Sequence, residues 1–209
     1  MIRILIADDH PIFRAGIRQL LSITSDIEII AEAESGQDVI AKVAKYECDV
    51  VVLDISMPGM GGLEALKLLK SLKPKLRILI LSAHREEEYA VRAIKAGAAG
   101  YVRKISTPEE LIIAIRQVFQ GRKYITPSLA EELASAMTIE KKLPHEALSD
   151  REYQVLRLIV KGLSIKELAE ELSLSPSTVA TFRARILHKM NMKTNIELAR
   201  YGIDNELFD

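Results

Sequence analysis

The chain has 209 residues, of which 48% are apolar and 28% are charged, a composition that supports a folded core and excludes a disordered chain. Its single cysteine, Cys48, excludes an intramolecular disulfide framework and favours a reducing compartment, so we expect a cytoplasmic protein. No apolar run approaches the roughly 18–20 residues that cross a bilayer, and we expect no membrane partner. The 29 acidic residues balance 29 Lys and Arg, which argues against a nucleic-acid partner only if the charge is spread evenly.

The first 120 residues alternate short apolar runs with amphipathic segments of helical length. The runs are mostly unbroken, which is typical of strands that are buried on both faces of a parallel sheet. We expect strands at 4–7, 27–31, 50–53, 78–81 and 100–102, and helices at about 12–23, 36–45, 62–72, 86–96 and 108–120. This order predicts an α/β domain over residues 1–121 with a five-stranded, parallel, doubly wound sheet.

The residues after this domain form a predicted connector, 122–147. Thr126-Pro127 begins a short helix over about 127–137, and residues 138–147 are typical of a linker.

The tail, residues 148–209, lacks strand patterns and is predicted to be a second, smaller, all-α domain. We expect four helices, at about 150–161, 165–171, 176–190 and 195–203. Ser149, Ser164 and Thr194 are each followed three residues later by Glu, which matches the capping box. Ser175-Pro176 offers an N-cap followed by proline at the first helical position.

Charged and polar side chains follow the predicted strands of the first domain. Asp8 and Asp9 follow the first strand, Asp54 the third, Ser82 the fourth and Lys104 the fifth. Ligands of open parallel sheets bind at this edge, so three carboxylates and one ammonium converge if the first, third and fifth strands are neighbours.

Such a set of like charges favours a cation and phosphoryl chemistry. Two carboxylates about 4 Å apart repel each other by roughly 4 kcal/mol at an effective dielectric constant near 20. An all-oxygen site suits Mg²⁺, beside which a carboxylate can act as a nucleophile on phosphorus. Strand-end Asp residues are also common caps and turn formers, but five groups at one edge favour the site.

Four segments carry a family resemblance, and their order and spacing are specific. Together they resemble the CheY-like receiver domain of two-component response regulators over about residues 1–120. The segments are 6–11 (IADDHP), 52–59 (VLDISMPG), 81–83 (LSA) and 100–104 (GYVRK).

The resemblance implies a role for each residue at the sheet edge. Asp54 would be the phosphoacceptor, and Asp8, Asp9, Asp54 and the backbone carbonyl of Ser56 would hold Mg²⁺. Ser82 and Lys104 would bind the phosphoryl group, and Ser82 and Tyr101 would form the switch. Ser56 and His84 occupy positions that modulate hydrolysis of the acyl phosphate in this family, and neither His10 nor His84 is expected to bind the metal.

The charges of the tail are unevenly distributed along its sequence. From residue 146 it has nine Lys and Arg against ten Asp and Glu, yet residues 175–195 contain no acidic residue. The short Ser173-Leu174 connection between two predicted helices suits a helix-turn-helix. A near-neutral domain can therefore present the basic face that phosphate binding needs.

The tail is similar to the LuxR-type helix-turn-helix in the segments 148–152 (LSDRE), 162–169 (GLSIKELA) and 174–179 (LSPSTV). Joined to a receiver, it resembles the NarL/FixJ family, which implies that the third helix of the tail enters the major groove and that the last supports dimerisation. Ala180 and Phe182 depart from the Lys and His that many members carry, which leaves the DNA sequence preference open. We expect Thr181 and Arg185 to contact base edges. Candidates for phosphate contacts are Lys166, Ser177, Thr178, Arg183 and Lys189.

The expected function is that of a transcription regulator and not of an enzyme. A sensor histidine kinase would phosphorylate Asp54, and the phosphorylated homodimer would bind double-stranded promoter DNA, with RNA polymerase as a further partner. One alternative is a phosphoaspartate hydrolase of the haloacid-dehalogenase type, although the Asp54-Ile55-Ser56 segment lacks the second Asp of that motif. Another is a receiver whose helical tail docks protein or RNA.

Overall fold

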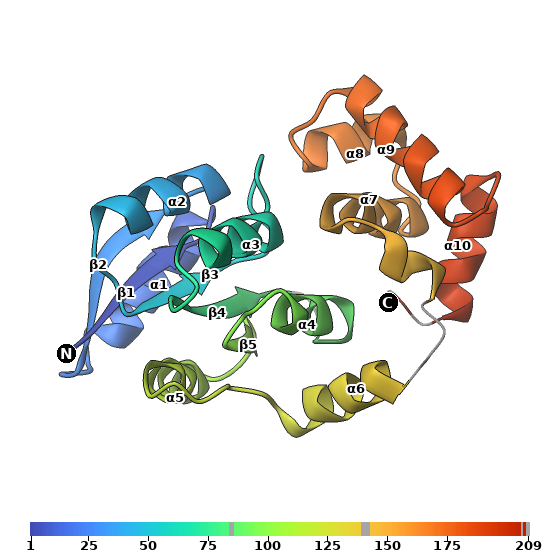
Figure 1. Ribbon diagram of the computed structural model, residues 1–209. Helices are drawn as coiled ribbons and strands as arrows, with labels where there is room; N and C mark the ends of the chain where they lie inside the picture. Colours follow the sequence, from blue (N-terminus) through green and yellow to red (C-terminus); the bar gives the residue numbers. More distant parts are fainter. Residues whose placement is uncertain (84–85, 139–142, 206, 208–209) are drawn as a thin grey trace. The chain divides into compact units, whose positions relative to one another are not determined.

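The computed structural model describes residues 1–83, 86–138, 143–205 and 207, with the backbone alone for 86–88, 132 and 135–138. His84 lies outside the described residues. The chain divides into two compact units, Met1–Ala134 and Ser135–Asp209, which are described separately (Figure 1). Across the described ranges, no helix combines the length and the apolar character that a membrane span requires.

Unit 1 contains a parallel sheet whose strand order, over the residues described, is β2-β1-β3-β4-β5. The strands are β1 (Ile2–Ala7), β2 (Ile27–Ala33), β3 (Val50–Leu53), β4 (Arg77–Ser82) and β5 (Gly100–Arg103). The predicted five-stranded, doubly wound fold is confirmed. The supposition that the first, third and fifth strands are neighbours is wrong, because β4 lies between β3 and β5.

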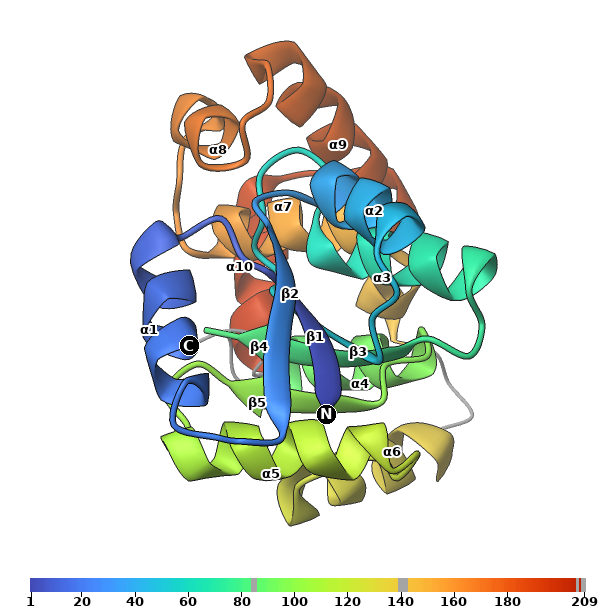
Figure 2. The same cartoon turned by 90° about the vertical axis from the view of Figure 1, so that its left-hand side faces the viewer.

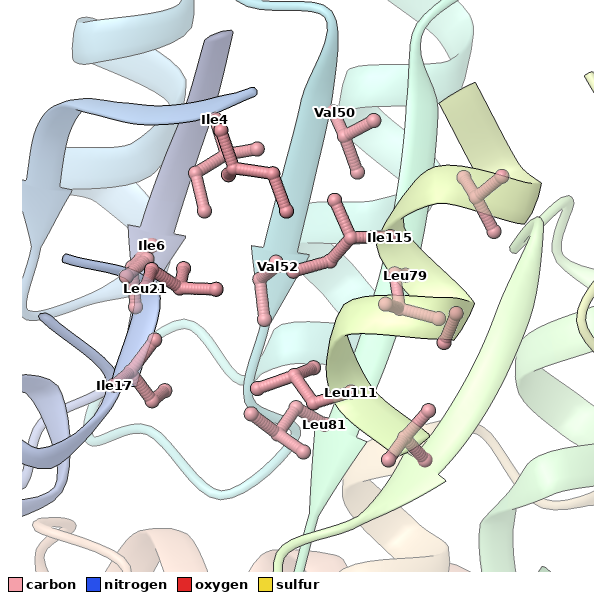
Figure 3. Packing of buried hydrophobic residues seen from close by; sticks show 14 of the residues in the cluster. Ile4, Ile6, Ile17, Leu21, Val50, Val52, Leu79, Leu81, Leu111 and Ile115 are labelled. Carbon is pink, nitrogen blue, oxygen red and sulfur yellow. The ribbon is translucent and has the colours of Figure 1, made fainter. Parts of the chain in front are cut away.

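The helices of unit 1 cover both faces of this sheet (Figure 2). They are α1 (Pro11–Leu21), α2 (Gly36–Lys45), α3 (Gly62–Leu72), α4 (Glu86–Lys95) and α5 (Pro108–Phe119). Figure 3 shows Ile17 and Leu21 of α1 and Leu111 and Ile115 of α5 packed over one face of the central strands. The residues of the central strands that face the other way are also buried, which explains the unbroken apolar runs.

The chain after α5 continues along the edge of the sheet. Tyr124 donates its backbone N–H to the carbonyl of Ala99 at 2.9 Å and forms an isolated parallel bridge with Gly100. A Cβ on Gly100 would lie 2.8 Å from Tyr124, so only glycine allows this approach. Helix α6 (Pro127–Thr138) follows, and its Leu129 is fully buried.

The described residues of unit 2 form helices joined by short turns, without a strand, and the four predicted helices are confirmed. After a short 3₁₀ helix, η1 (Pro144–Ala147), come α7 (Asp150–Val160), α8 (Ile165–Glu171), α9 (Pro176–Lys189) and α10 (Asn195–Asp204). Their core includes the buried side chains of Tyr153, Leu156, Leu168, Val179, Ile186 and Leu198.

The helix starts of unit 2 mostly follow their sequence signatures. Ser149 and Ser164 form reciprocal capping boxes, and Ser175 caps α9 ahead of proline. The predicted capping box at Thr194 is wrong. Its hydroxyl accepts from the backbone of Glu197, but the Glu197 carboxylate accepts from the N–H of Lys193 at 3.0 Å. Thr194 also has a different backbone angle, with a φ of −134°, whereas the two serines that form capping boxes have −63° and −68°.

Candidate functional site

The carboxyl edge of the sheet holds a compact acidic pocket. The side chains of Asp8 and Asp54 are only 2% and 1% exposed, at the ends of β1 and β3. The Lys104 ammonium lies 2.5 Å from Asp8 Oδ2 and 2.9 Å from Asp54 Oδ2. Although β4 separates the two strands that carry Asp54 and Lys104, a lysine side chain is long enough to reach past its end.

The chain around Asp54 fixes the direction of its carboxylate. Its backbone N–H donates to the carbonyl of Ala7 at 2.8 Å, which prolongs the pairing of β1 with β3. The N–H of Ser56 donates to Asp54 Oδ1 at 3.2 Å. A Cβ on Gly62 would lie 1.9 Å from the Asp54 carbonyl oxygen, so glycine is required where α3 begins. The strand and the following loop together hold Asp54 in place.

Charge and burial oppose each other in the pocket. Burial of the Asp54 carboxyl raises its pKa above the usual range, and the charge of Asp8 adds to this, while Lys104 acts in the opposite direction. Burial disfavours the charged form of Lys104, but the charge of Asp54 and the hydrogen bonds to both carboxylates outweigh it, so the pKa of Lys104 is raised. Lys104 is therefore an ammonium that neutralises part of the acidic charge.

The oxygen atoms of the pocket fit a divalent cation. Atoms of Asp8, Asp9, His10 and Asp54 lie within 4.8 Å of one another. Asp9 Oδ1 is buried and accepts no hydrogen bond in the described chain, although His10 Nδ1 lies 2.9 Å away. A buried, unsatisfied carboxylate oxygen among other carboxylates is the environment that a hard cation relieves. The acidic pocket is thus consistent with a metal site.

The predicted switch residues are both buried at the same side of the sheet. Ser82 is fully buried as the last residue of β4, and its carbonyl accepts the N–H of Lys104 at 2.7 Å. Tyr101 on β5 is also fully buried, in register with Ile80 of β4.

Two residues that sequence reasoning missed lie in the first turn of α1. The ring of Phe13 lies 4.5 Å from the Lys104 ammonium, a distance that suits a cation–π contact. Arg14 is buried and donates to the backbone carbonyl of Asp8 at 2.6 Å. In the sequence both look like ordinary positions of an amphipathic helix, so no local signal distinguishes them.

Helix α9 presents the predicted basic face of unit 2. Thr181 and Arg185 are exposed, whereas Val179 and Ile186 are buried, as the helical spacing predicts. The hydroxyls of Ser177 and Thr178 each lie within 2.8 Å of the Ser175 hydroxyl at the start of α9. Lys166 is exposed on α8. The described residues of α9 include no acidic side chain.

The two remaining predicted phosphate contacts are engaged within unit 2. Arg183 donates to the Asn195 side chain at 2.6 Å and so ties α9 to the start of α10. Lys189 donates at 2.6 Å to the buried carboxylate of Glu152, which also accepts the N–H of Ser149. Burial alone would raise the pKa of Glu152, but the hydrogen bond from Lys189 helps to hold that pKa below its usual value.

Two family models match the chain. A model described as response regulator receiver domain matches residues 4–116, and one described as bacterial regulatory proteins, luxR family, matches residues 146–202. The chain belongs to the response-regulator family. A receiver followed by a LuxR-type domain confirms the NarL/FixJ arrangement expected from the sequence. This is a family of transcription regulators and not of catalytic enzymes, so the hydrolase alternative is set aside.

Relatives of this response regulator align over nearly its full length. It is 37% identical over 209 residues to the response regulator UvrY of Escherichia coli, which covers 99% of this chain and 96% of that protein. The response regulator GacA of Pseudomonas aeruginosa is 35% identical over 211 residues, covering 100% and 99%. A solved structure of RcsB from Salmonella enterica serovar Typhimurium, bound to promoter rprA in the presence of phosphomimetic BeF3-, has a TM-score of 0.66 at 26% identity and covers 96% and 97%.

Proposed function

We propose that a sensor histidine kinase phosphorylates this response regulator on Asp54 and that the phosphorylated chain binds promoter DNA as a dimer and regulates transcription. One observation carries the proposal. A buried carboxylate that is held against Lys104 at 2.9 Å occurs in the same chain as a helix, α9, that has one exposed face and no acidic side chain. We place this activity in the cytoplasm, with RNA polymerase as a further partner.

The pocket supports phosphoryl transfer to Asp54. One carboxylate oxygen of Asp54 forms a bond to phosphorus as the phosphorus–nitrogen bond of the phosphohistidine breaks, and the imidazole nitrogen leaves with the electron pair. Lys104 offers a positive charge to the transferred oxygens, and Ser82 offers a hydroxyl at the end of the neighbouring strand. Such positioning and charge stabilisation supply most of what phosphoryl transfer requires.

The acidic residues would hold Mg²⁺. Asp8, Asp9 and Asp54 would supply carboxylate oxygens, and the backbone of Ser56 would supply a carbonyl. When bound, the cation neutralises negative charge on the carboxylates and the transferring group. His10, whose side chain is 64% exposed, is not proposed as a ligand.

The new charge on Asp54 would bias two arrangements of the sheet edge. Lys104 and the hydroxyl of Ser82 would turn towards the phosphoryl group, and Tyr101 would fill the space that Ser82 leaves. A phosphoryl group acts in this way by changing local charge and packing at an element with two states.

The exposed face of α9 supports DNA recognition. We propose that Thr181 and Arg185 contact base edges in the major groove. We propose phosphate contacts for Lys166, Ser177, Thr178, Arg183 and Lys189. The engagement of Arg183 and Lys189 within unit 2 means that a phosphate would share these cations with Asn195 and Glu152. The structural likeness to RcsB, which was solved with a promoter, supports this use of the domain. A dimer would read half-sites about one helical turn apart.

The test is to incubate the chain with acetyl phosphate and Mg²⁺, map the modified residue by mass spectrometry after borohydride reduction, and follow the oligomeric state by gel filtration. We expect one modified residue, Asp54, and a shift from monomer to dimer. Modification at another residue would contradict the site, and an unchanged elution volume of fully modified protein would contradict the dimer.

A further inference from the structure

Arg14 places a charged guanidinium beside the acidic pocket and away from water. Its side chain is 9% exposed although it lies on α1, in the first turn of the helix. Buried guanidinium groups are stable only when their donors are paired. Each of the pairs that Arg14 makes connects α1 to another part of unit 1.

The guanidinium reaches three acceptors. Its Nη1 donates to the backbone carbonyl of Asp8 at 2.6 Å, its Nε to Glu32 at 3.2 Å, and its Nη2 to Glu34 at 2.5 Å. Glu32 belongs to β2, and Glu34 follows that strand directly. The planar guanidinium of arginine presents its N–H donors in fixed, separate directions and can therefore reach all three acceptors at once. The ammonium of lysine is a compact point charge and cannot reach all three.

The main chain of Asp8 is fixed from both sides as a result. Its N–H donates to the carbonyl of Ala33 at 3.0 Å, and its carbonyl accepts from Arg14. A residue whose N–H and carbonyl are both hydrogen-bonded has a fixed backbone, and this restricts where its side chain can lie. The two Asp8 oxygens accept from the N–H of His10 at 2.8 Å and from Lys104 at 2.5 Å.

We infer that Arg14 is a positioning residue of the acidic pocket, which acts on the cation through the main chain of Asp8. The inference rests on the proposed cation site. Residues that hold metal ligands in place commonly contribute 10- to 100-fold to metal affinity.

The sign of the effect separates positioning from charge. Removing a positive charge near the pocket, and freeing two carboxylates, would strengthen Mg²⁺ binding if Arg14 acted through its charge alone. Loss of the bond to Asp8 would weaken it. Loss of stability alone would lower the melting temperature and leave the Mg²⁺ affinity of the folded protein unchanged.

The experiment compares Arg14→Met with the full wild-type chain by calorimetric titration with Mg²⁺ alone, with circular dichroism to confirm folding. We expect the dissociation constant for Mg²⁺ to rise about tenfold. We also expect the rate of labelling by acetyl phosphate to recover at saturating Mg²⁺. Arg14→Lys keeps the positive charge but lacks the forked guanidinium, and it is the more conservative substitution. We expect it also to weaken Mg²⁺ binding.

Arg18→Met is the matched control. Arg18 lies one turn further along α1 and also pairs with Glu32, but its side chain is 60% exposed, and its described bonds do not reach Asp8. We expect its Mg²⁺ affinity to stay within twofold of wild type.

Each result decides a separate point. A wild-type chain that binds no Mg²⁺ would overturn the cation site and this inference with it. A wild-type chain that binds Mg²⁺ while Arg14→Met binds it equally or more tightly would overturn this inference alone. Full affinity in Arg14→Lys would also overturn it, because the forked guanidinium would then not be needed to hold Asp8 in place.

Discussion

The acidic pocket of unit 1 and the basic face of unit 2 are built in opposite ways. Asp8, Asp54 and Lys104 each follow a different strand directly, and two of their side chains are almost completely buried. Thr181 and Arg185 come from one helix and are exposed. The pocket therefore depends on the whole sheet, whereas the face depends on one helix and its packing.

This difference predicts two kinds of response to substitution. Groups in the pocket share contacts, so changing one should alter the chemistry as a whole. The side chains on the face are proposed to contact different parts of a nucleic acid, so changing one should weaken binding by a limited and nearly additive amount.

Asp54→Asn should give the largest effect, a complete loss of labelling by acetyl phosphate, because an amide is not a nucleophile. Mass spectrometry of the labelled chain measures it. Asp49→Asn is the matched control at the opposite end of β3, where the carboxylate pairs with Arg3. Undiminished labelling of Asp54→Asn would contradict the assignment of Asp54 as the phosphoacceptor.

Lys104→Ala should slow labelling by roughly 10²-fold, the usual cost of removing one donor from a group that develops charge. Initial rates at fixed acetyl phosphate and Mg²⁺ measure it. Lys75→Ala, at an exposed position of the same unit, should label at the wild-type rate. Equal rates for both variants would remove Lys104 from the chemistry.

Arg185→Ala should weaken specific DNA binding by about 1–3 kcal/mol, if the guanidinium makes a bidentate contact with a base. Fluorescence anisotropy with a captured promoter site measures it. Arg200→Ala removes another exposed arginine of unit 2, on α10, and should change binding little. An unchanged affinity of Arg185→Ala for the promoter site would place Arg185 outside the interface.

Lys189→Met should destabilise unit 2 by about 1–2 kcal/mol, because it leaves the carboxylate of Glu152, 4% exposed, without its cation. The expected loss is below that of a fully buried pair, because the Lys189 side chain is 38% exposed. Hydrogen exchange of the α7 amides measures the change. Unchanged protection would mean that the other partners of Glu152 suffice.

The same pair predicts a smaller effect of pH. Burial alone would raise the pKa of Glu152, but hydrogen bonds from Lys189 and Ser149 outweigh it and hold the pKa below its usual value. A lowered carboxyl pKa gives stability that is present above the ordinary Glu pKa of about 4.3 and is lost as the pH falls through the folded value. Protection of the α7 amides should therefore decline on acidification in wild type and less so in Lys189→Met.

Much of the face and part of the pocket could be predicted from the sequence. Helical spacing separates Val179 and Ile186 from Thr181 and Arg185 without any tertiary information. The order of Asp8, Asp54 and Lys104 along the strands also predicts a shared edge.

The remaining features depend on tertiary contacts between distant residues. Strand order cannot be derived from strand pattern alone, so the place of β4 between β3 and β5 was missed. Arg14 meets Asp8, Glu32 and Glu34 only once β1 and β2 pair. The bond between Lys189 and Glu152 was not predicted, because the two residues lie 37 positions apart in the sequence.

The most direct test of the account is genome-wide capture of DNA by the wild-type chain, with and without phosphorylation, beside Asp54→Asn treated in the same way. We expect phosphorylated wild type to enrich a limited set of paired half-sites about one helical turn apart, and Asp54→Asn not to respond to treatment. Recovery of the same sites with equal yield from all the samples would contradict the proposed link between the acidic pocket and the basic face.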